Sequence, residues 1–276
     1  MPAQTIALIT SAAAHFGATV DMVNDHQVRL QVPIQHRDGY VERYALLASA
    51  NGSRVTVKEE VATHLPPFCP ERHINADGSF CLAWQESDRL EILDEETAIT
   101  WWATLWKFLS EQRRAARLRR WPTSLGRAHG DAARYQALAQ SAAEALGLVR
   151  AGKTVDTAGL RIQRCRGNHS RREDTLRLYR GDEYLYSVWL QQEKLTNQKR
   201  PCRCSSTGQS RPRRFRRCGD HAAQAVVLAM SLHKWQVAEA EFWEALQGRT
   251  CCGTCDGCPL SENNASQLVA ATPLEQ

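Results

Sequence analysis

Residues 65–82 read LPPFCPERHINADGSFCL, and this stretch decides how the rest of the chain is interpreted. Prolines and a glycine interrupt it, and it follows neither a helical nor a strand period. A long irregular segment inside a compact domain is usually functional when it is ordered. Cys81 lies at its end in a glycine-containing loop, with His73 upstream, so its thiol is a candidate nucleophile. The alternative is a buried and unreactive cysteine.

The residues before this stretch predict one helix followed by strands. Apolar residues at three- and four-residue spacing predict a helix that stops near Gly17. Apolar and polar residues then alternate at 20–34, 44–48 and 55–57, which predicts strands. Residues 51–52, Asn-Gly, predict a hairpin turn. A helix followed by an antiparallel meander indicates an α+β fold.

The residues after the stretch predict two helices and a domain boundary. Residues 95–119 carry apolar side chains around more than half of the helix circumference, which is typical of a central helix. The alanine-rich residues 129–148 predict a second helix. Glycines then suggest a boundary near 150, so we predict domains over 1–150 and 151–276.

The chain has 276 residues and ten cysteines, of which only Cys69 and Cys81 lie before residue 150. No apolar run is long enough to span a bilayer, and no basic region precedes the apolar N-terminal stretch. We therefore expect a cytoplasmic protein with no membrane partner. Clustered thiols in a reducing compartment usually serve metal binding or catalysis. Cys69 is expected to be structural, with redox pairing to Cys81 as the alternative.

The second half begins with a predicted hairpin at 176–179 and 184–190 and ends with a long helix at 222–247. Between them, residues 194–217 hold nine basic residues and no acidic ones. We weigh three interpretations of this stretch. It is a solvated loop around a metal site, a docking surface for an acidic protein, or, least favoured, a contact for nucleic acid phosphates.

Two cysteine clusters in the second half predict metal binding. Three thiols and an imidazole in the first cluster fit a tetrahedral zinc site. The second cluster has the spacing of a zinc knuckle, or of an iron–sulfur motif completed by Cys165 or Cys251. Zinc with a structural role is the preferred interpretation, as two ions or one shared ion, and free thiols are the alternative. The predicted ligands are Cys202, Cys204, Cys218, His221, Cys252, Cys255 and Cys258.

The stretch that ends in Gly78-Ser-Phe-Cys81-Leu82 resembles the active-site segment of ubiquitin-conjugating enzymes, in which Gly-x-(Ile/Leu)-Cys-Leu follows a His-Pro-Asn triplet. Glu71-Arg72-His73 stands in place of the triplet, with His73 at the position of the asparagine. Bacterial relatives from antiphage operons that encode a ubiquitin-like protein (Bil type) are similar in departing at this triplet. The resemblance implies a UBC fold over about residues 1–148, with a Cys-rich zinc-binding region after it.

The resemblance also implies a function. Cys81 would accept a ubiquitin-like C-terminus from an activating enzyme by transthiolation and pass it to an amine of a protein substrate, and His73 would donate a hydrogen bond to the oxyanion. The basic cysteine cluster at 202–221 is similar to the zinc tail of the SecA translocation ATPase. The rival interpretation is a non-catalytic zinc-binding adaptor or nucleic-acid-binding protein with a degenerate UBC fold.

Overall fold

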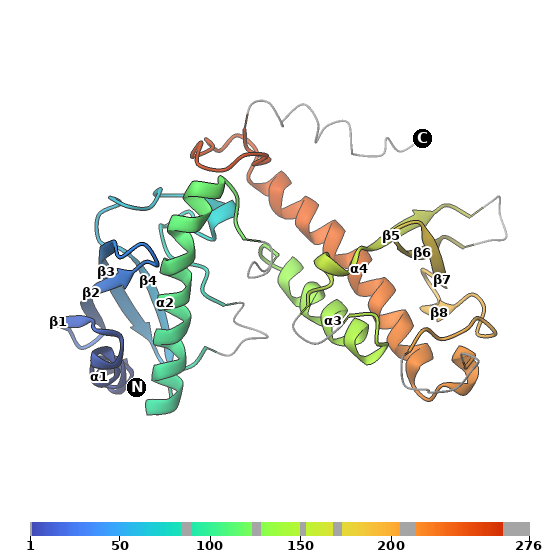
Figure 1. Cartoon of the computed structure of the whole chain (residues 1–276), viewed down its shortest axis with the longest axis horizontal. Coiled ribbons are helices and arrows are strands. Elements are labelled where there is room, and N and C mark those ends of the chain that lie inside the picture. The colour runs from blue at the N-terminus through green and yellow to red at the C-terminus, as the bar shows by residue number, and fades with distance from the viewer. Residues whose placement is uncertain are drawn as a thin grey trace. The chain divides into compact units, whose positions relative to one another are not determined.

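A computed structural model describes residues 2–83, 90–122, 128–149, 153–167, 173–204 and 213–261. These residues form two compact units (Figure 1). The first unit joins Met1–Pro122 to Leu246–Gln276, and the second is Thr123–Ala245. Among the described residues, none of the helices combines the length and the hydropathy needed to cross a bilayer.

The first unit is a mixed α and β structure, as predicted. Its sheet is an antiparallel meander in the order β1-β2-β3-β4. Gly17, with φ of +64°, ends the N-terminal helical segment, where an L side chain would be strained. The elements are α1 (Pro2–Ala12), η1 (Ala13–Phe16), β1 (Thr19–Asn24), β2 (Gln27–Gln35), β3 (Val41–Asn51), β4 (Arg54–Glu59), η2 (Pro70–Arg72) and α2 (Glu95–Leu118).

One face of the meander and the helix α2 supply the core of the first unit. Alternate residues of β2, from Val28 to Ile34, are fully buried. Helix α2 begins with a capping box between Asp94 and Thr97. It buries Trp102, whose indole N–H donates to the Ile9 carbonyl at 2.9 Å. The predicted central helix is therefore confirmed, and it ties α1 to the sheet.

The second unit pairs two helices with a small sheet. The sheet is antiparallel in the order β5-β6-β7-β8, and α4 contacts both α3 and the sheet. The predicted hairpin and long helix are present, whereas β5 and β8 were not predicted. The elements are α3 (Ala132–Ala145), η3 (Asp156–Ala158), β5 (Leu160–Cys165), β6 (Thr175–Arg180), β7 (Glu183–Trp189), β8 (Lys194–Leu195), η5 (Phe215–Arg217) and α4 (His221–Ala245).

The segment after α4, residues 246–261, belongs to the first unit and packs into its core. Cys255 and Cys258 are 4% and 1% exposed and share a buried cluster with the side chains of β2 and α2. Arg119 Nε lies 2.6 Å from Asp256 Oδ1. The two contact units therefore differ from the predicted domains 1–150 and 151–276. The contacts do not test where independently folding domains end, so the boundary near residue 150 stays a prediction.

Candidate functional site

Cys81 follows a short backbone ladder that extends the meander. The Phe80 N–H donates to the Val57 carbonyl of β4 at 2.8 Å, and Ile74 bridges to Phe80 on the other side. The Cys81 N–H then donates to the His73 carbonyl at 2.8 Å. Phe80 and Ile74 are buried, whereas Cys81 is exposed. The fold therefore fixes the backbone at Cys81 and leaves its side chain accessible to a partner.

A tight turn at 75–79 supports the residues just before Cys81. The Gly78 N–H donates to the Asn75 carbonyl at 3.0 Å, and Gly78 has φ of +80°, a value that favours glycine. The Asp77 carboxylate accepts hydrogen bonds from the hydroxyl and the backbone N–H of Ser79. Both bonds hold the pKa of Asp77 below its usual value, and the bond from the Ser79 hydroxyl has the larger effect. The turn therefore carries a negative charge beside the nucleophile loop.

The backbone carbonyl of His73 accepts the hydrogen bond from Cys81, and the residue is 8% exposed. It adopts the left-handed conformation, with φ of +56°, at the end of η2. Its ring packs edge-on against Trp121, with 5.1 Å between ring centroids. The predicted role of the imidazole as an oxyanion donor stays a prediction, because these contacts describe a packed ring.

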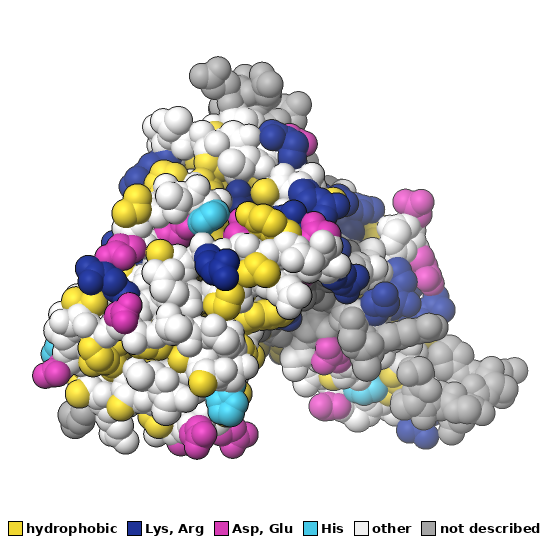
Figure 2. Space-filling view, turned by 60° about the vertical axis from the view of Figure 1, so that its left-hand side comes forward, with side chains coloured by type: hydrophobic (Ala, Val, Ile, Leu, Met, Phe, Trp, Pro, Cys, Tyr) yellow, Lys and Arg dark blue, Asp and Glu magenta, His cyan; other side chains and the backbone are white. Residues whose placement is uncertain are grey.

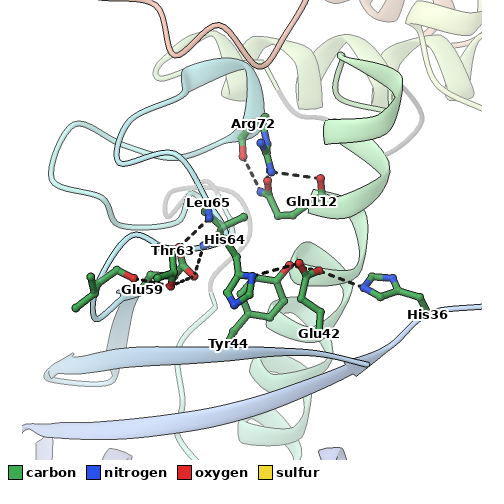
Figure 3. Close-up of polar contacts among 10 residues, drawn as sticks. His36, Glu42, Tyr44, Glu59, Thr63, His64, Leu65, Arg72 and Gln112 are labelled. Atoms are coloured by element: carbon green, nitrogen blue, oxygen red, sulfur yellow. Dashed lines mark hydrogen bonds and ion pairs between the residues drawn. The ribbon is translucent and has the colours of Figure 1, made fainter. Parts of the chain in front are cut away.

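Hydrogen bonds to two buried side chains, Glu59 and Gln112, hold the irregular segment in place (Figure 3). The Glu59 carboxylate, at the end of β4, accepts hydrogen bonds from the backbone N–H groups of His64 and Leu65 at 3.2 and 2.9 Å. Arg72 Nε donates to Gln112 Oε1 at 2.8 Å, and Gln112 Nε2 donates back to the Arg72 carbonyl at 2.9 Å. One end of the segment is thus fastened to the sheet, and the part before His73 is fastened to α2.

We expect Gln112→Leu to lower the free energy of unfolding by about 2–3 kcal/mol, because it leaves the buried Arg72 guanidinium without its side-chain acceptor. Leucine roughly preserves the volume, so little of the loss comes from a cavity. In urea denaturation, the double variant Arg72→Met/Gln112→Leu should lose less than the sum of the two single variants. A Gln112→Leu variant within about 0.5 kcal/mol of the original chain would contradict this role.

The structure brings four predicted ligands together in the second unit. The ligand atoms of Cys202, Cys204, Cys218 and His221 all lie within 4.8 Å of one another. Two thiols lie 3.3 Å from His221 Nδ1, and Cys204 Sγ lies 3.4 Å from Cys218 Sγ. Atoms bound tetrahedrally to zinc at 2.0–2.3 Å are roughly 3.3–3.8 Å apart, so these residues fit the ion.

Burial determines the protonation state of the thiols in this cluster when no cation is present. Burial raises the pKa of the Cys202 thiol to about 12 and raises the pKa of Cys218 as well. Without a cation, these thiols are therefore protonated at neutral pH, whereas a bound divalent ion stabilises the thiolates that bind it. His221 begins α4, and η5 ends just before Cys218, so regular backbone holds two of the four donors.

The other predicted ligands, Cys252, Cys255 and Cys258, do not join that cluster. They lie in the C-terminal segment of the first unit. Their neighbour there is Cys69, which belongs to the same cluster and whose Sγ lies 3.8 Å from Thr254 Oγ1. The sequence spacing did not reveal Cys69 as a partner, because it lies far from these cysteines along the chain and follows no ligand motif.

Comparison with protein families finds two models that match the chain, one in each half. Residues 16–123 match the model of a prokaryotic E2 domain, where E2 denotes the ubiquitin-conjugating class. The chain carries a prokaryotic E2 domain. Residues 128–260 match a cysteine-rich domain that lies C-terminal to E2 domains. No curated protein and no solved structure matches the chain.

The E2 match covers the first half of the chain, and the match to the cysteine-rich domain covers most of the second. The meander, the irregular segment and α2 all lie within the E2 match. The match to the cysteine-rich domain includes both the four-ligand cluster and the C-terminal cysteines. The family domain therefore extends beyond the second unit, since residues 246–260 belong to the first unit.

Proposed function

We propose that the chain is a ubiquitin-conjugating-type acyltransferase with Cys81 as its thioester-forming residue. The observation that carries the proposal is an exposed thiol on a backbone-fixed loop within a prokaryotic E2 domain. The partners are a ubiquitin-like protein, its activating enzyme and a protein substrate. Cytoplasmic conditions suit such chemistry, because they keep the thiol reduced.

The reaction needs two acyl transfers. The Cys81 thiolate attacks the thioester carbonyl on the activating enzyme, a new carbon–sulfur bond forms, and the enzyme's cysteine leaves as a thiolate. A substrate amine then attacks the Cys81 thioester, releases the Cys81 thiolate and passes its proton to solvent. Since the carbonyl is already activated and the leaving group is good, a positioned thiol is the main requirement. His73 is the proposed donor to the oxyanion of the tetrahedral intermediates.

The test is a charging assay. The purified chain is mixed with the activating enzyme, ATP and the ubiquitin-like protein from its own operon. We expect an adduct with the mass of the chain plus the ubiquitin-like protein, which dithiothreitol removes. If the activating enzyme is demonstrably charged and no adduct forms, the proposal fails.

A non-catalytic adaptor is the second candidate, and the buried His73 ring favours it. An imidazole packed against Trp121 is less available for catalysis than an exposed side chain. In that case the chain would bind the activating enzyme or the ubiquitin-like protein without forming an adduct. The charging assay, run alongside a binding measurement, separates the two functions.

The basic residues in the cysteine-rich unit give less support to nucleic acid binding. Arg203 forms an ion pair with Glu183, and the guanidinium of Arg200 lies 4.3 Å from the ring centroid of Tyr184. Figure 2 shows Lys and Arg side chains among acidic and hydrophobic ones on one face of the molecule, and residues 205–212 of the basic stretch lie outside the described residues. We therefore propose that this unit is a zinc-stabilised scaffold held by Cys202, Cys204, Cys218 and His221.

We further propose that the conjugation acts in antiphage defence, as in operons of the Bil type. The support is the resemblance of the Cys81 loop to bacterial relatives from such operons. Cells that carry the operon with Cys81→Ala should then lose protection in a plaque assay, whereas undiminished protection would separate defence from the thiol.

A further inference from the structure

Five thiols gather on the first unit, and none of them belongs to the four-ligand cluster of the second. They come from two segments that lie far apart in the sequence. Cys69 is 1% exposed, and its Sγ lies 3.8 Å from Oγ1 of Thr254, a residue between Cys252 and Cys255. The other four thiols pack in or against the same hydrophobic cluster as Cys69. The five residues are Cys69, Cys251, Cys252, Cys255 and Cys258, and we call them the C-terminal thiol cluster.

The backbone of the C-terminal segment turns sharply around these thiols. Gly253 and Gly257 have φ of +68° and +71°, a conformation that favours glycine. The Gly253 N–H donates to Cys251 Sγ at 3.4 Å, and Thr254 Oγ1 lies 3.1 Å from Cys252 Sγ. Turns of this kind let cysteines three residues apart direct their thiols toward one point, as in zinc knuckles.

Arg119, the C-cap residue of α2, holds the same turns in place. The guanidinium of Arg119 lies 2.6 Å from the Asp256 carboxylate and donates to the Gly253 carbonyl at 3.0 Å. The Asp256 N–H donates to the Arg119 carbonyl at 2.6 Å. The segment is therefore held against the unit on both sides of Cys255.

We infer that Cys69, Cys252 and Cys255 are ligands of a second zinc ion, and that one thiol of the Cys251–Cys258 pair completes a four-thiolate set. The ion would join the C-terminal segment to the E2 domain. It differs from the ion proposed for Cys202, Cys204, Cys218 and His221, because none of the five thiols belongs to that group of ligand atoms.

A shared ion explains the arrangement better than disulfides do. A disulfide joins one thiol to one other, whereas these five cysteines are all free thiols that pack in or against one cluster. Five thiols also cannot all be paired. Zinc accepts four thiolates around one centre, so one ion can bind most of these sulfur atoms.

The inferred site lies at the base of the Cys81 loop. The backbone groups of Cys69 and Ile74 exchange hydrogen bonds at 3.1 and 3.0 Å, and Ile74 bridges to Phe80, the residue before Cys81. Fixing Cys69 with a metal would therefore restrain the inner edge of that loop. The metal site itself does not depend on the proposed conjugation, because its ligands and its test involve no acyl transfer.

The test counts zinc in the full-length chain purified under reducing conditions. We expect two equivalents in the original chain, one in Cys69→Ser and one in Cys204→Ser. The half-buried Cys252 allows a second variant that perturbs the core less, and Cys252→Ser should also hold one equivalent. Cys165→Ser, a matched change at a thiol outside both sets, should keep two.

Cobalt substitution in Cys204→Ser gives a second readout. The remaining ion should show the intense visible bands of tetrahedral cobalt thiolate, and these should vanish on adding Cys69→Ser. Two equivalents of zinc retained in both Cys69→Ser and Cys252→Ser would overturn the inference. So would a single equivalent in the original chain that disappears completely in Cys204→Ser.

Discussion

Replacing Cys81 with alanine should abolish the adduct with the ubiquitin-like protein, below detection in the charging assay. The reason is chemical, because the new acyl bond in the proposed reaction is made to the Cys81 sulfur. Cys81→Ser should charge far more slowly, since a hydroxyl is almost fully protonated at neutral pH. Any adduct it forms is an oxygen ester, which dithiothreitol should not remove.

Two controls make this result specific. Cys165→Ala removes a partly exposed thiol of the second unit and should leave the adduct unchanged. Thermal unfolding of Cys81→Ala should match that of the original chain, because an exposed side chain contributes little to the core. An adduct that persists in Cys81→Ala would assign the acyl group to another residue and overturn the proposed role.

Removing the metal from the second unit should unfold it. Cys218 is 6% exposed and shares a buried cluster with Phe215 and Leu228. Structural zinc contributes roughly 10–16 kcal/mol in zinc-finger peptides, which is comparable to the whole stability of a domain. Cys218→Ser should therefore lose one equivalent of zinc and become open to proteolysis between residues 128 and 245.

Far-ultraviolet circular dichroism and mapped proteolysis check this expectation. The signal of α3 and α4 should fall, while the meander and α2 of the first unit stay resistant to protease. Cys165→Ser lies at the end of β5 in the same unit and should keep both zinc and helices. A Cys218→Ser variant that loses zinc but keeps its helices would show that the metal does not stabilise this unit.

Local sequence patterns predicted the elements with strong periodicity. Helix α2 and the strands of the meander bury a regular face, so their spacing was informative. Strand β5 has only one buried residue, Ile162, and β8 has two residues in all, so neither shows a detectable alternation. Both depend on pairing with β6 and β7, which a local pattern does not contain.

The candidate sites also differ in how far a local sequence pattern predicts them. The Cys81 loop and the four ligands around Cys218 are short motifs, so the sequence alone suggested them. The partnership of Cys69 with the C-terminal cysteines depends on contacts such as that between Cys69 and Thr254, which are 185 residues apart. Only the folded chain brings those thiols together.

The return of residues 246–261 to the first unit has a consequence for biosynthesis. A ribosome releases the meander and α2 early, then the whole of the second unit, and only afterwards the segment with Cys255 and Cys258. Until that segment emerges, the nascent E2 domain has an open apolar face beside Cys69. The second unit therefore has time to fold on the ribosome before the first unit can be completed.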